Sequence, residues 1–328
     1  MTSSPSGTGV VRTALEAATR APSPHNTQPW RFETGPDRIE VFLDRQRVLA
    51  VADPAGREAR IACGAAILNL RLALAAAGQA SEVVLLPDRQ DPDHLATVRL
   101  TWRRQPRTRE RELARAIGHR RSNRRPFSER PVPGWVRESM VEAARAEGAE
   151  LTLLMHPGDL DALAALVRRA ERVQDEDPLF QAELRQWTSN GEPRADGVPS
   201  VAGGPRPAPG SLLTLRQYDV HAPVRPYEGE VLVGVLGSST DTPLAQLRSG
   251  MALQRVLLTG TTAGISASFL AQPVELPDTR AALRSLLGGH MHPQAVLRFG
   301  YGFTAPATRR RPVESVAREA ERGEEASC

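Results

Sequence analysis

The sequence LRSGMAL at residues 247–253 repeats the frame of IACGAAI at residues 61–67, and this pair of segments decides the fold. The glycine at the centre of each segment is followed fourteen positions later by another glycine, Gly78 or Gly264. Nine residues beyond each of these glycines, a proline closes a short apolar run. Two glycines and a proline in the same order favour an internally duplicated unit over a chance match.

The repeated segments belong to long alanine- and leucine-rich stretches, which predict helices at 61–77 and 243–262. Alternation of apolar and polar residues predicts half-buried strands at 39–43, 95–102 and 295–299. Because helices and strands are interleaved, we expect an α+β fold with the two glycine-bearing helices packed as a central pair. The duplication predicts a first half at residues 1–105 and a second half at residues 106–328.

The segment from about residue 189 to 230 differs from the rest of the chain. It is rich in glycine and proline and contains few apolar residues. Such composition is typical of a long loop rather than a domain, so we expect a lid inserted into the second half.

Composition excludes several classes of function. The 328 residues include 42 basic ones, all of them arginine, against 38 acidic residues. Without lysine there can be no Schiff base and no P-loop, which excludes pyridoxal phosphate enzymes and P-loop nucleotidases. The net charge of +4 and the pI near 9.7 are mild, aromatic residues make up only 4%, and the arginines are scattered. We therefore expect no nucleic-acid partner.

Nothing in the sequence predicts secretion or a membrane span. Residues 1–8 lack the apolar core of a signal peptide. The longest apolar helix, 61–77, is interrupted by Asn69 and Arg71. Two cysteines provide no disulfide framework. We expect a cytoplasmic protein without a membrane partner.

The stretch GHRRSNRRPF at residues 118–127 places four arginines and a serine within six residues. Guanidinium groups and a hydroxyl can bind a phosphate through several parallel hydrogen bonds. A solvated, arginine-rich turn is the alternative, and the local sequence leaves both open.

The loop APSPHNTQPWRF at residues 21–32 is the second candidate site. Its prolines restrict the backbone, and its hydroxyl and amide groups suit the polar edge of a heterocycle. A turn between a helix and a strand is the alternative.

These two stretches resemble motifs of the nitroreductase superfamily. Residues 22–32 are similar to its P-S-x-x-N-x-Q-P-W-x-F signature, and residues 120–124 to its R-R-S-x-R segment. Residues 261–266 resemble its A-x-x-x-G-I/L-x stretch. Residues 300–302 and 310–314 resemble the closing G-Y-P and R-x-P-L-E pattern. The motifs cover the chain from about residue 10 to 318.

The order of the motifs is reversed relative to ordinary nitroreductases, in which R-R-S-x-R comes first. Ordinary members are homodimers with the flavin between subunits, so the reversed order implies a fused pair of halves that keeps one complete site. This arrangement is similar to the Acg family of actinobacterial FMN-binding proteins. The resemblance implies a nitroreductase-like mixed sheet with packed helices, in a monomeric pseudo-dimer or a homodimer.

The resemblance also implies the residues that bind FMN. By this resemblance, the phosphate and ribityl end of FMN contacts Arg120, Ser122, Arg124 and Arg310. Ser23 and Asn26 contact the edge of the ring, and the backbone at 264–265 approaches N5. The full set is Pro22, Ser23, Asn26, Arg120, Arg121, Ser122, Arg124, Gly264, Ile265 and Arg310. We expect no catalytic acid or base and no metal, since His290 and His292 lack further ligands at a suitable spacing.

Two functions follow from the resemblance. The first is an oxidoreductase that transfers hydride from NAD(P)H through FMN to an electron-poor small molecule, such as a nitroaromatic or a quinone. The alternative is a non-catalytic protein that stores or sequesters FMN beneath its lid.

Overall fold

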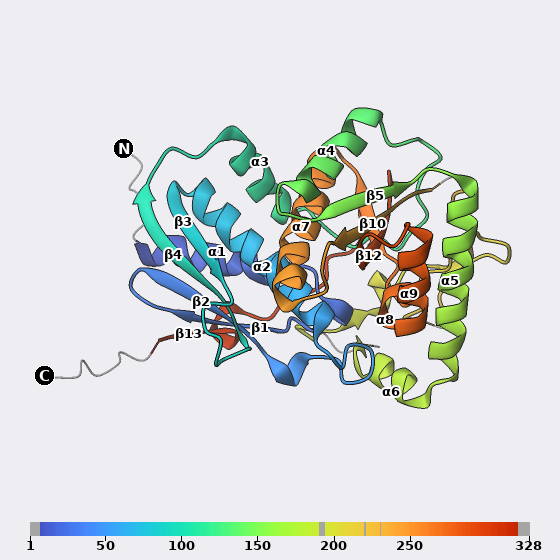
Figure 1. Cartoon of the computed structure of the whole chain (residues 1–328), viewed down its shortest axis with the longest axis horizontal. Helices are drawn as coiled ribbons and strands as arrows, with labels where there is room; N and C mark the ends of the chain where they lie inside the picture. The colour runs from blue at the N-terminus through green and yellow to red at the C-terminus, as the bar shows by residue number, and fades with distance from the viewer. Residues whose placement is uncertain (1–6, 190–193, 220, 230, 321–328) are drawn as a thin grey trace, which may run out of the picture.

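A computed structural model of the chain describes residues 7–189, 194–219, 221–229 and 231–320. A five-stranded and a four-stranded β-sheet stand on either side of a central pair of long helices (Figure 1). The five-stranded sheet is mixed and the four-stranded one antiparallel, and helices alternate with strands along the chain. Two short parallel pairs, β6 (Thr188–Ser189) with β7 (Val198–Pro199) and β8 (Arg206–Pro207) with β9 (Val224–Arg225), lie in the lid segment. The molecule is therefore an α+β protein, which confirms the fold class expected from the sequence.

The central helices are α2 (Arg57–Ala76) and α7 (Pro243–Thr262), and they cross at the two repeated glycines. A Cβ atom on Gly64 or on Gly250 would collide with a backbone carbonyl oxygen of the opposite helix. The helices can approach this closely only because both positions lack a side chain. The repeated glycines are thus the contact that joins the two sides of the molecule.

Polar side chains fix the first turns of both central helices. The carboxylate of Asp53 accepts hydrogen bonds from the backbone N–H groups of Glu58, at 3.1 Å, and Ala59, at 2.8 Å. The hydroxyl of Thr242 accepts from the backbone N–H of Ala245 at 3.3 Å. These acceptors satisfy N–H groups that the first turn of a helix leaves unpaired.

The first sheet has the strand order β13-β1-β2-β4-β3. Its strands are β1 (Trp30–Thr34), β2 (Arg38–Leu43), β3 (Gln79–Leu85), β4 (His94–Arg103) and β13 (Ala317–Glu319). Because apolar and polar residues alternate at 39–43, Ile39, Val41 and Leu43 lie on one face of β2. There they pack in a core shared with α2 and with α1 (Gly7–Thr19). Strand β13 pairs in parallel with β1, although nearly three hundred residues separate them in the sequence.

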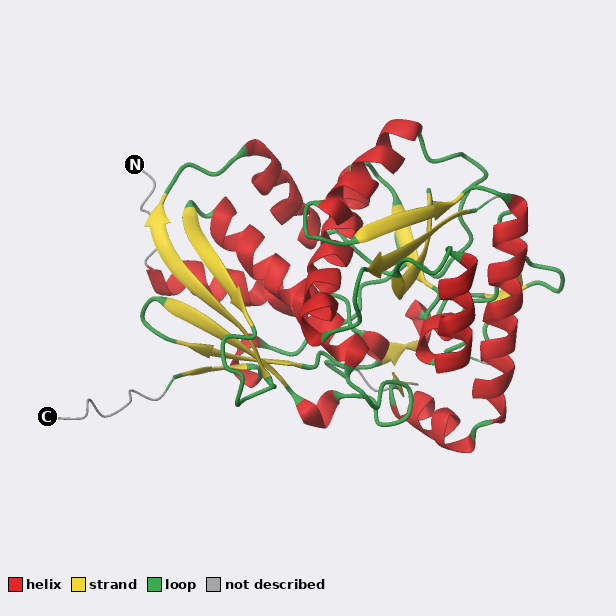
Figure 2. Cartoon of the chain, in the orientation of Figure 1, coloured by secondary structure: helices red, strands yellow, loops and turns green. Residues whose placement is uncertain are grey.

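The second sheet has the order β11-β12-β10-β5 and is covered on both faces (Figure 2). Its strands are β5 (Glu150–Leu154), β10 (Leu232–Ser238), β11 (Ser266–Phe269) and β12 (His292–Gly300). Helix α7 and α4 (Gly134–Arg145) cover one face. The other face is covered by α5 (Pro157–Glu176), α8 (Gln272–Glu275) and α9 (Pro277–Leu286).

Two elements of the range 106–328 belong to the first core. Helix α3 (Thr108–Ile117) packs against both central helices, and β13 completes the first sheet. The first core therefore draws on both sides of the expected boundary, and the division at residue 105 stays a prediction. Neither α3 nor α6 (Pro178–Gln186) was expected from the sequence, because few of their residues are apolar and buried.

Helix α2 is long and apolar enough to span a membrane by length and composition alone. In the structure, 83% of its most apolar window is buried inside the protein. It therefore has the packing of a core helix.

Candidate functional site

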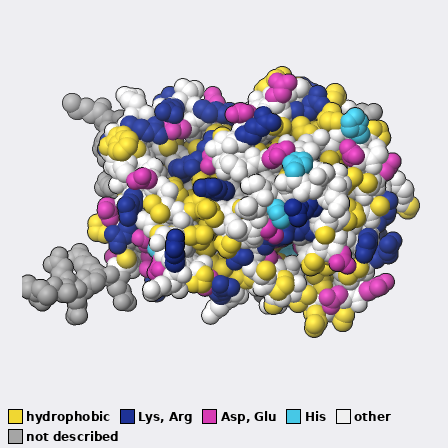
Figure 3. Space-filling view, in the orientation of Figure 1, with side chains coloured by type: hydrophobic (Ala, Val, Ile, Leu, Met, Phe, Trp, Pro, Cys, Tyr) yellow, Lys and Arg dark blue, Asp and Glu magenta, His cyan; other side chains and the backbone are white. Residues whose placement is uncertain are grey.

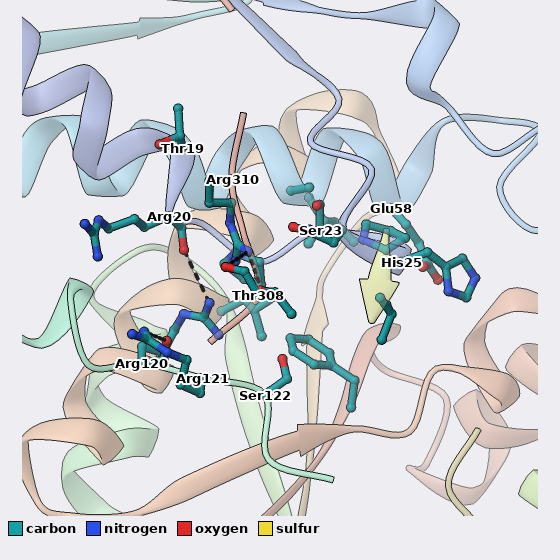
Figure 4. Close-up of a pocket in the computed structure, with 18 of the residues that line it drawn as sticks. Thr19, Arg20, Ser23, His25, Glu58, Arg120, Arg121, Ser122, Thr308 and Arg310 are labelled. Carbon is teal, nitrogen blue, oxygen red and sulfur yellow. Dashed lines mark hydrogen bonds between the residues drawn. The ribbon is translucent and has the colours of Figure 1, made fainter. Parts of the chain in front are cut away.

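A cavity of about 470 Å³ lies where distant parts of the chain meet. Its wall is formed by the loop after α1, the first turns of α2, the arginine run, the segments that follow β11, and residues 306–314. The arginines lie at one side of the cavity, Ser23 and Ser122 near its middle, and His25 and Glu58 at the other side (Figure 4). Such a volume suits a small molecule or a cofactor.

The arginine side of the cavity holds positive charge without a counter-ion. Within the described residues, Arg20, Arg120, Arg121 and Arg310 form no ion pair, whereas Arg12 and Arg311 at the rim pair with carboxylates. The Nε and Nη1 atoms of Arg120 and the Nε atom of Arg310 are buried and have no hydrogen-bond partner. Unpaired buried donors destabilise a protein unless a ligand satisfies them.

Burial and neighbouring positive charges lower the pKa values of two of these arginines. Burial, with the nearby charges of Arg310 and Arg121, lowers the pKa of Arg120 from 12.5 to about 9. Burial and the charges of Arg121 and Arg20 lower the pKa of Arg310 to about 10. Both groups stay charged at neutral pH, so this side of the cavity carries positive charge.

The arginine run is tied to strand β11. Residue Ser122 forms a parallel bridge with Ala267, and the backbone N–H of Asn123 donates to the carbonyl oxygen of Ala267 at 2.8 Å. The side-chain amide of Asn123 donates to the carbonyl oxygen of Phe303 at 2.9 Å. These bonds hold the run along the cavity wall.

The loop after α1 contains the short 3-10 turn η1 (Pro24–Asn26) and has an unusual backbone. His25, Asn26 and Gln28 all have positive φ angles, of 45°, 59° and 54°. Such conformations are strained in residues other than glycine and are frequent at functional sites. The hydroxyl of Ser23 accepts the backbone N–H of Gln28 at 3.0 Å and so braces this loop.

Asn26 joins three parts of the cavity wall. Its Nδ2 atom donates to the carbonyl oxygens of Gly197, at 3.0 Å, and Arg309, at 3.1 Å. Its Oδ1 atom is buried and accepts no hydrogen bond from the described part of the chain. The loop therefore offers an unused acceptor to a ligand that carries an N–H group.

Buried titratable groups line the side opposite the arginines. Arg216 pairs with Glu275 at 2.5 Å, and both side chains are less than 10% exposed. Burial raises the pKa of Glu58 to about 8, although the Arg57 guanidinium at 2.7 Å favours its charged form. Burial lowers the pKa of His25 to about 3, so its ring is neutral.

Residues of the expected lid cover the cavity from this side. Val198, Arg216 and Tyr218 belong to its lining. The guanidinium of Arg124 lies 4.6 Å from the ring centroid of Tyr218 and donates to the carbonyl oxygen of Ala202 at 3.0 Å. The segment thus packs on the cavity, while residues 190–193, 220 and 230 lie outside the described residues.

Most of the residues expected from the sequence line one cavity. They are Pro22, Ser23, Asn26, Arg120, Arg121, Ser122, Arg124 and Arg310. Arg124 differs from the other three arginines because its guanidinium contacts the lid segment.

Gly264 and Ile265 are not among the residues that line the cavity, and their contact with FMN stays a prediction. Gly264 follows α7 with φ of +74°, and Ile265 is buried in the core beside α4. Beyond them, the chain reaches the cavity at Phe269, the last residue of β11, and then through Ala271 and α8. The buried Val274 and Glu275, which line the cavity after Pro273, were not expected from the sequence.

On the face drawn in Figure 3, basic side chains are scattered among acidic and apolar ones.

Two similar proteins cover nearly the whole chain. The "Putative NAD(P)H nitroreductase acg" of Mycobacterium tuberculosis strain H37Rv is 35% identical over 320 residues, or 94% of this chain and 95% of that protein. The chain belongs to the nitroreductase superfamily, among its Acg-like proteins. Another relative of this superfamily, "Putative NAD(P)H nitroreductase Rv3131" of the same strain, is 36% identical over 302 residues, or 89% and 85% of the two chains. The family resemblance stated from the motifs is thereby confirmed.

No family model matches the chain. Among solved structures, a nitroreductase with bound FMN from Bacteroides fragilis NCTC 9343 aligns with 66% of this chain and 98% of its own, at 15% identity and a TM-score of 0.37.

Proposed function

We propose that this Acg-like nitroreductase binds FMN in the cavity and transfers hydride from NAD(P)H to an electron-poor acceptor such as a nitroaromatic or a quinone. One observation carries the proposal: buried guanidinium nitrogens of Arg120 and Arg310, without hydrogen-bond partners among the described residues, lie at one end of a cavity whose lining also includes apolar side chains. The names of its two relatives, both NAD(P)H nitroreductases, support the reaction class.

The residues present fit FMN. Arg120 and Arg310 would bind the phosphate, whose negative charge satisfies their free donors. Apolar side chains of Ile61, Leu253 and Phe269 would contact the ring. The free Oδ1 atom of Asn26 would accept an N–H of the ring edge.

When bound, FMN supplies the redox chemistry by accepting hydride from NAD(P)H and passing it to the acceptor. The chain supplies position and electrostatics. The arginines fix the phosphate end, the strained η1 loop holds Ser23 and Asn26 at the wall, and the lid segment excludes water. We assign no side chain as the acid or base.

The reversed motif order fits a fused pair, and we propose that residues 1–105 and 106–328 are its two halves. In support, residues from both ranges line the cavity. The first range supplies the η1 loop and α2, and the second supplies the arginine run and residues 306–314.

A second candidate, sequestration of FMN, is favoured by the attachment of the lid segment. Arg47 pairs with Asp196 at 3.0 Å, and the Gln28 amide donates to the carbonyl oxygen of Ala195 at 2.8 Å. Bonds of this kind on both sides of the cavity would restrict the approach of a second molecule to the ring.

Two measurements test these proposals in order. Titration of the apoprotein with FMN and with riboflavin, which lacks the phosphate, tests the cofactor site. We expect FMN to bind about 100-fold more tightly, because two charge-assisted hydrogen bonds are worth about 3 kcal/mol or more. Equal affinities would refute the phosphate assignment.

The loaded protein is then mixed anaerobically with NADPH, with free FMN at the same concentration as the control. Rapid loss of the flavin's visible absorbance, well ahead of the control, supports the oxidoreductase. A spectrum that stays unchanged for minutes contradicts turnover and supports sequestration.

A further inference from the structure

A buried ion pair lies outside the cavity and connects two segments that line it, the arginine run and the lid segment. Arg298, on β12, and Glu228, at the end of the lid segment, are each only 2% exposed and are separated by 2.5 Å. A fully buried pair stabilises a fold little unless its remaining donors and acceptors are also satisfied. Here they are satisfied by the arginine run.

Arg298 donates to the backbone of that run. Its Nη2 atom donates to the carbonyl oxygens of Arg125, at 2.8 Å, and Asn123, at 3.3 Å. Its Nε atom donates to the hydroxyl of Ser268, at 3.2 Å, on the neighbouring strand β11. One guanidinium thus fixes the direction of two carbonyl groups, of Asn123 and Arg125, which lie just after Arg120–Ser122 in the run.

Glu228 binds the same run from the lid side. Its Oε2 atom accepts the backbone N–H of Phe127 at 2.8 Å, while its Oε1 atom pairs with Arg298. The adjacent Tyr227 donates its hydroxyl to the carbonyl oxygens of Arg124, at 2.6 Å, and Pro205, at 3.0 Å. The end of the lid segment is therefore bonded along residues 124–127.

Close packing locks the ring of Phe127 into this cluster. The Arg298 guanidinium lies 4.0 Å from the centroid of the Phe127 ring. A Cβ atom on Gly300 or Gly302 would collide with that ring, and one on Gly204 would collide with Arg124. Arginine run, lid segment and β12 meet with no space for relative displacement.

We propose that Arg298 is a positioning residue that joins the phosphate-binding run to the end of the lid, so that cofactor affinity and lid closure are set together. The role rests on the proposed function, because the ligand is FMN. Without the guanidinium, the run would lose the contacts that hold its free donors toward the cavity, and binding would have to order it. The lid would lose the same anchor.

Arg298→Lys tests the proposal. Lysine can keep the charge opposite Glu228, but it lacks the planar fork that reaches two carbonyls and Ser268 together. We expect the Kd for FMN, measured by quenching of flavin fluorescence, to rise about 10-fold to 100-fold, as for other outer partners of a binding site. We also expect faster trypsin cleavage after Arg216 of the lid segment, which is buried in its pair with Glu275 when the segment is in place, with and without FMN.

Glu147→Gln is the matched control. Glu147 is a carboxylate with 5% exposure that pairs with Arg71 and Arg255, away from the cavity. It should reduce thermal stability while the Kd for FMN stays within about twofold of the wild type and the lid stays protected. If Arg298→Lys does not fold, Glu228→Gln replaces it, because glutamine can still accept from Phe127 but carries no charge.

A folded Arg298→Lys protein with wild-type affinity for FMN and a protected lid would overturn the proposal. So would faster cleavage at an unchanged Kd, since the two properties would then be separate. If the wild type itself bound no FMN, the proposed function would fail. In that case, trypsin cleavage of the wild-type and Arg298→Lys apoproteins would test only whether Arg298 anchors the lid segment. Equal cleavage rates would show that it does not.

Discussion

Replacement of Arg120 by methionine should move the stability of the apoprotein and its affinity for FMN in opposite directions. Arg120 is 5% exposed, and its Nε and Nη1 atoms have no partner. The depression of its pKa from 12.5 to about 9 corresponds to roughly 5 kcal/mol for keeping the charge buried at neutral pH. A methionine of similar length removes that penalty.

The substitution also removes favourable contacts in the apoprotein. The hydrogen bond from Nη2 to the carbonyl oxygen of Arg20, at 3.3 Å, contributes about 1 kcal/mol. Imperfect packing of the new side chain costs about 1.5 kcal/mol. We therefore expect the free energy of unfolding of the apoprotein to rise by about 2 kcal/mol.

FMN should bind the variant far more weakly. Loss of two charge-assisted hydrogen bonds to the phosphate, worth about 1.5–3 kcal/mol each, raises Kd by about 100-fold or more. Urea denaturation of the apoprotein and fluorescence titration with FMN measure the two effects. Arg125→Met is the control, because Arg125 lies in the same run but outside the cavity lining.

The reasoning would be refuted if the Arg120→Met apoprotein were less stable than the wild type, or if both proteins bound FMN equally. In the first case the guanidinium would be contributing to the fold, and in the second it would not face the phosphate.

Three further substitutions test other parts of the structure. Gly250→Ala forces α2 and α7 apart and should lower the free energy of unfolding by about 3 kcal/mol. Gly158→Ala is the control, because a Cβ atom there meets nothing within 4 Å, and it should change the free energy of unfolding little. Equal effects of the two substitutions in urea denaturation would argue against the close crossing. Asp53→Ala removes the acceptor of two N–H groups at the start of α2 and should reduce stability by about 1–2 kcal/mol in the same assay, and no loss would mean that the cap is dispensable. Glu58 keeps a proton in the folded state that it releases on unfolding, so stability should fall as pH rises from its ordinary pKa of 4.5 to about 8; the slope should vanish in Glu58→Gln, and a persistent slope would assign the effect to another group.

Local patterns in the sequence predicted several of the helices and strands. The helix expected at 243–262 has those bounds in the structure, and the strand at 39–43 lies within β2. Both depend on periodicity over a single segment, which a sequence displays directly. The motifs likewise placed the loop after α1 and the arginine run at one cavity.

Features that depend on distant pairing could not be predicted. Nothing near residue 317 indicates that β13 pairs with β1, because the partner is almost three hundred residues away. The irregular composition of the lid segment concealed Tyr218 and Glu228, whose roles come from what they contact. Ile265 lies in the core rather than in the cavity lining, because a motif specifies the order of residues but not which of them the fold turns toward a cavity.

The pairing of β13 with β1 has a consequence for biosynthesis. Residues 306–314, which supply Arg310 to the cavity, are held in place between β12 and this last strand. A nascent chain makes both central helices and β12 before it has made Arg310 and the strand that follows it. A polypeptide released before residue 310 would lack one of the two arginines proposed to bind the cofactor phosphate, and one released before residue 317 would lack the strand that follows residues 306–314. Under the proposed function, tight binding of FMN would therefore require that synthesis has passed β13.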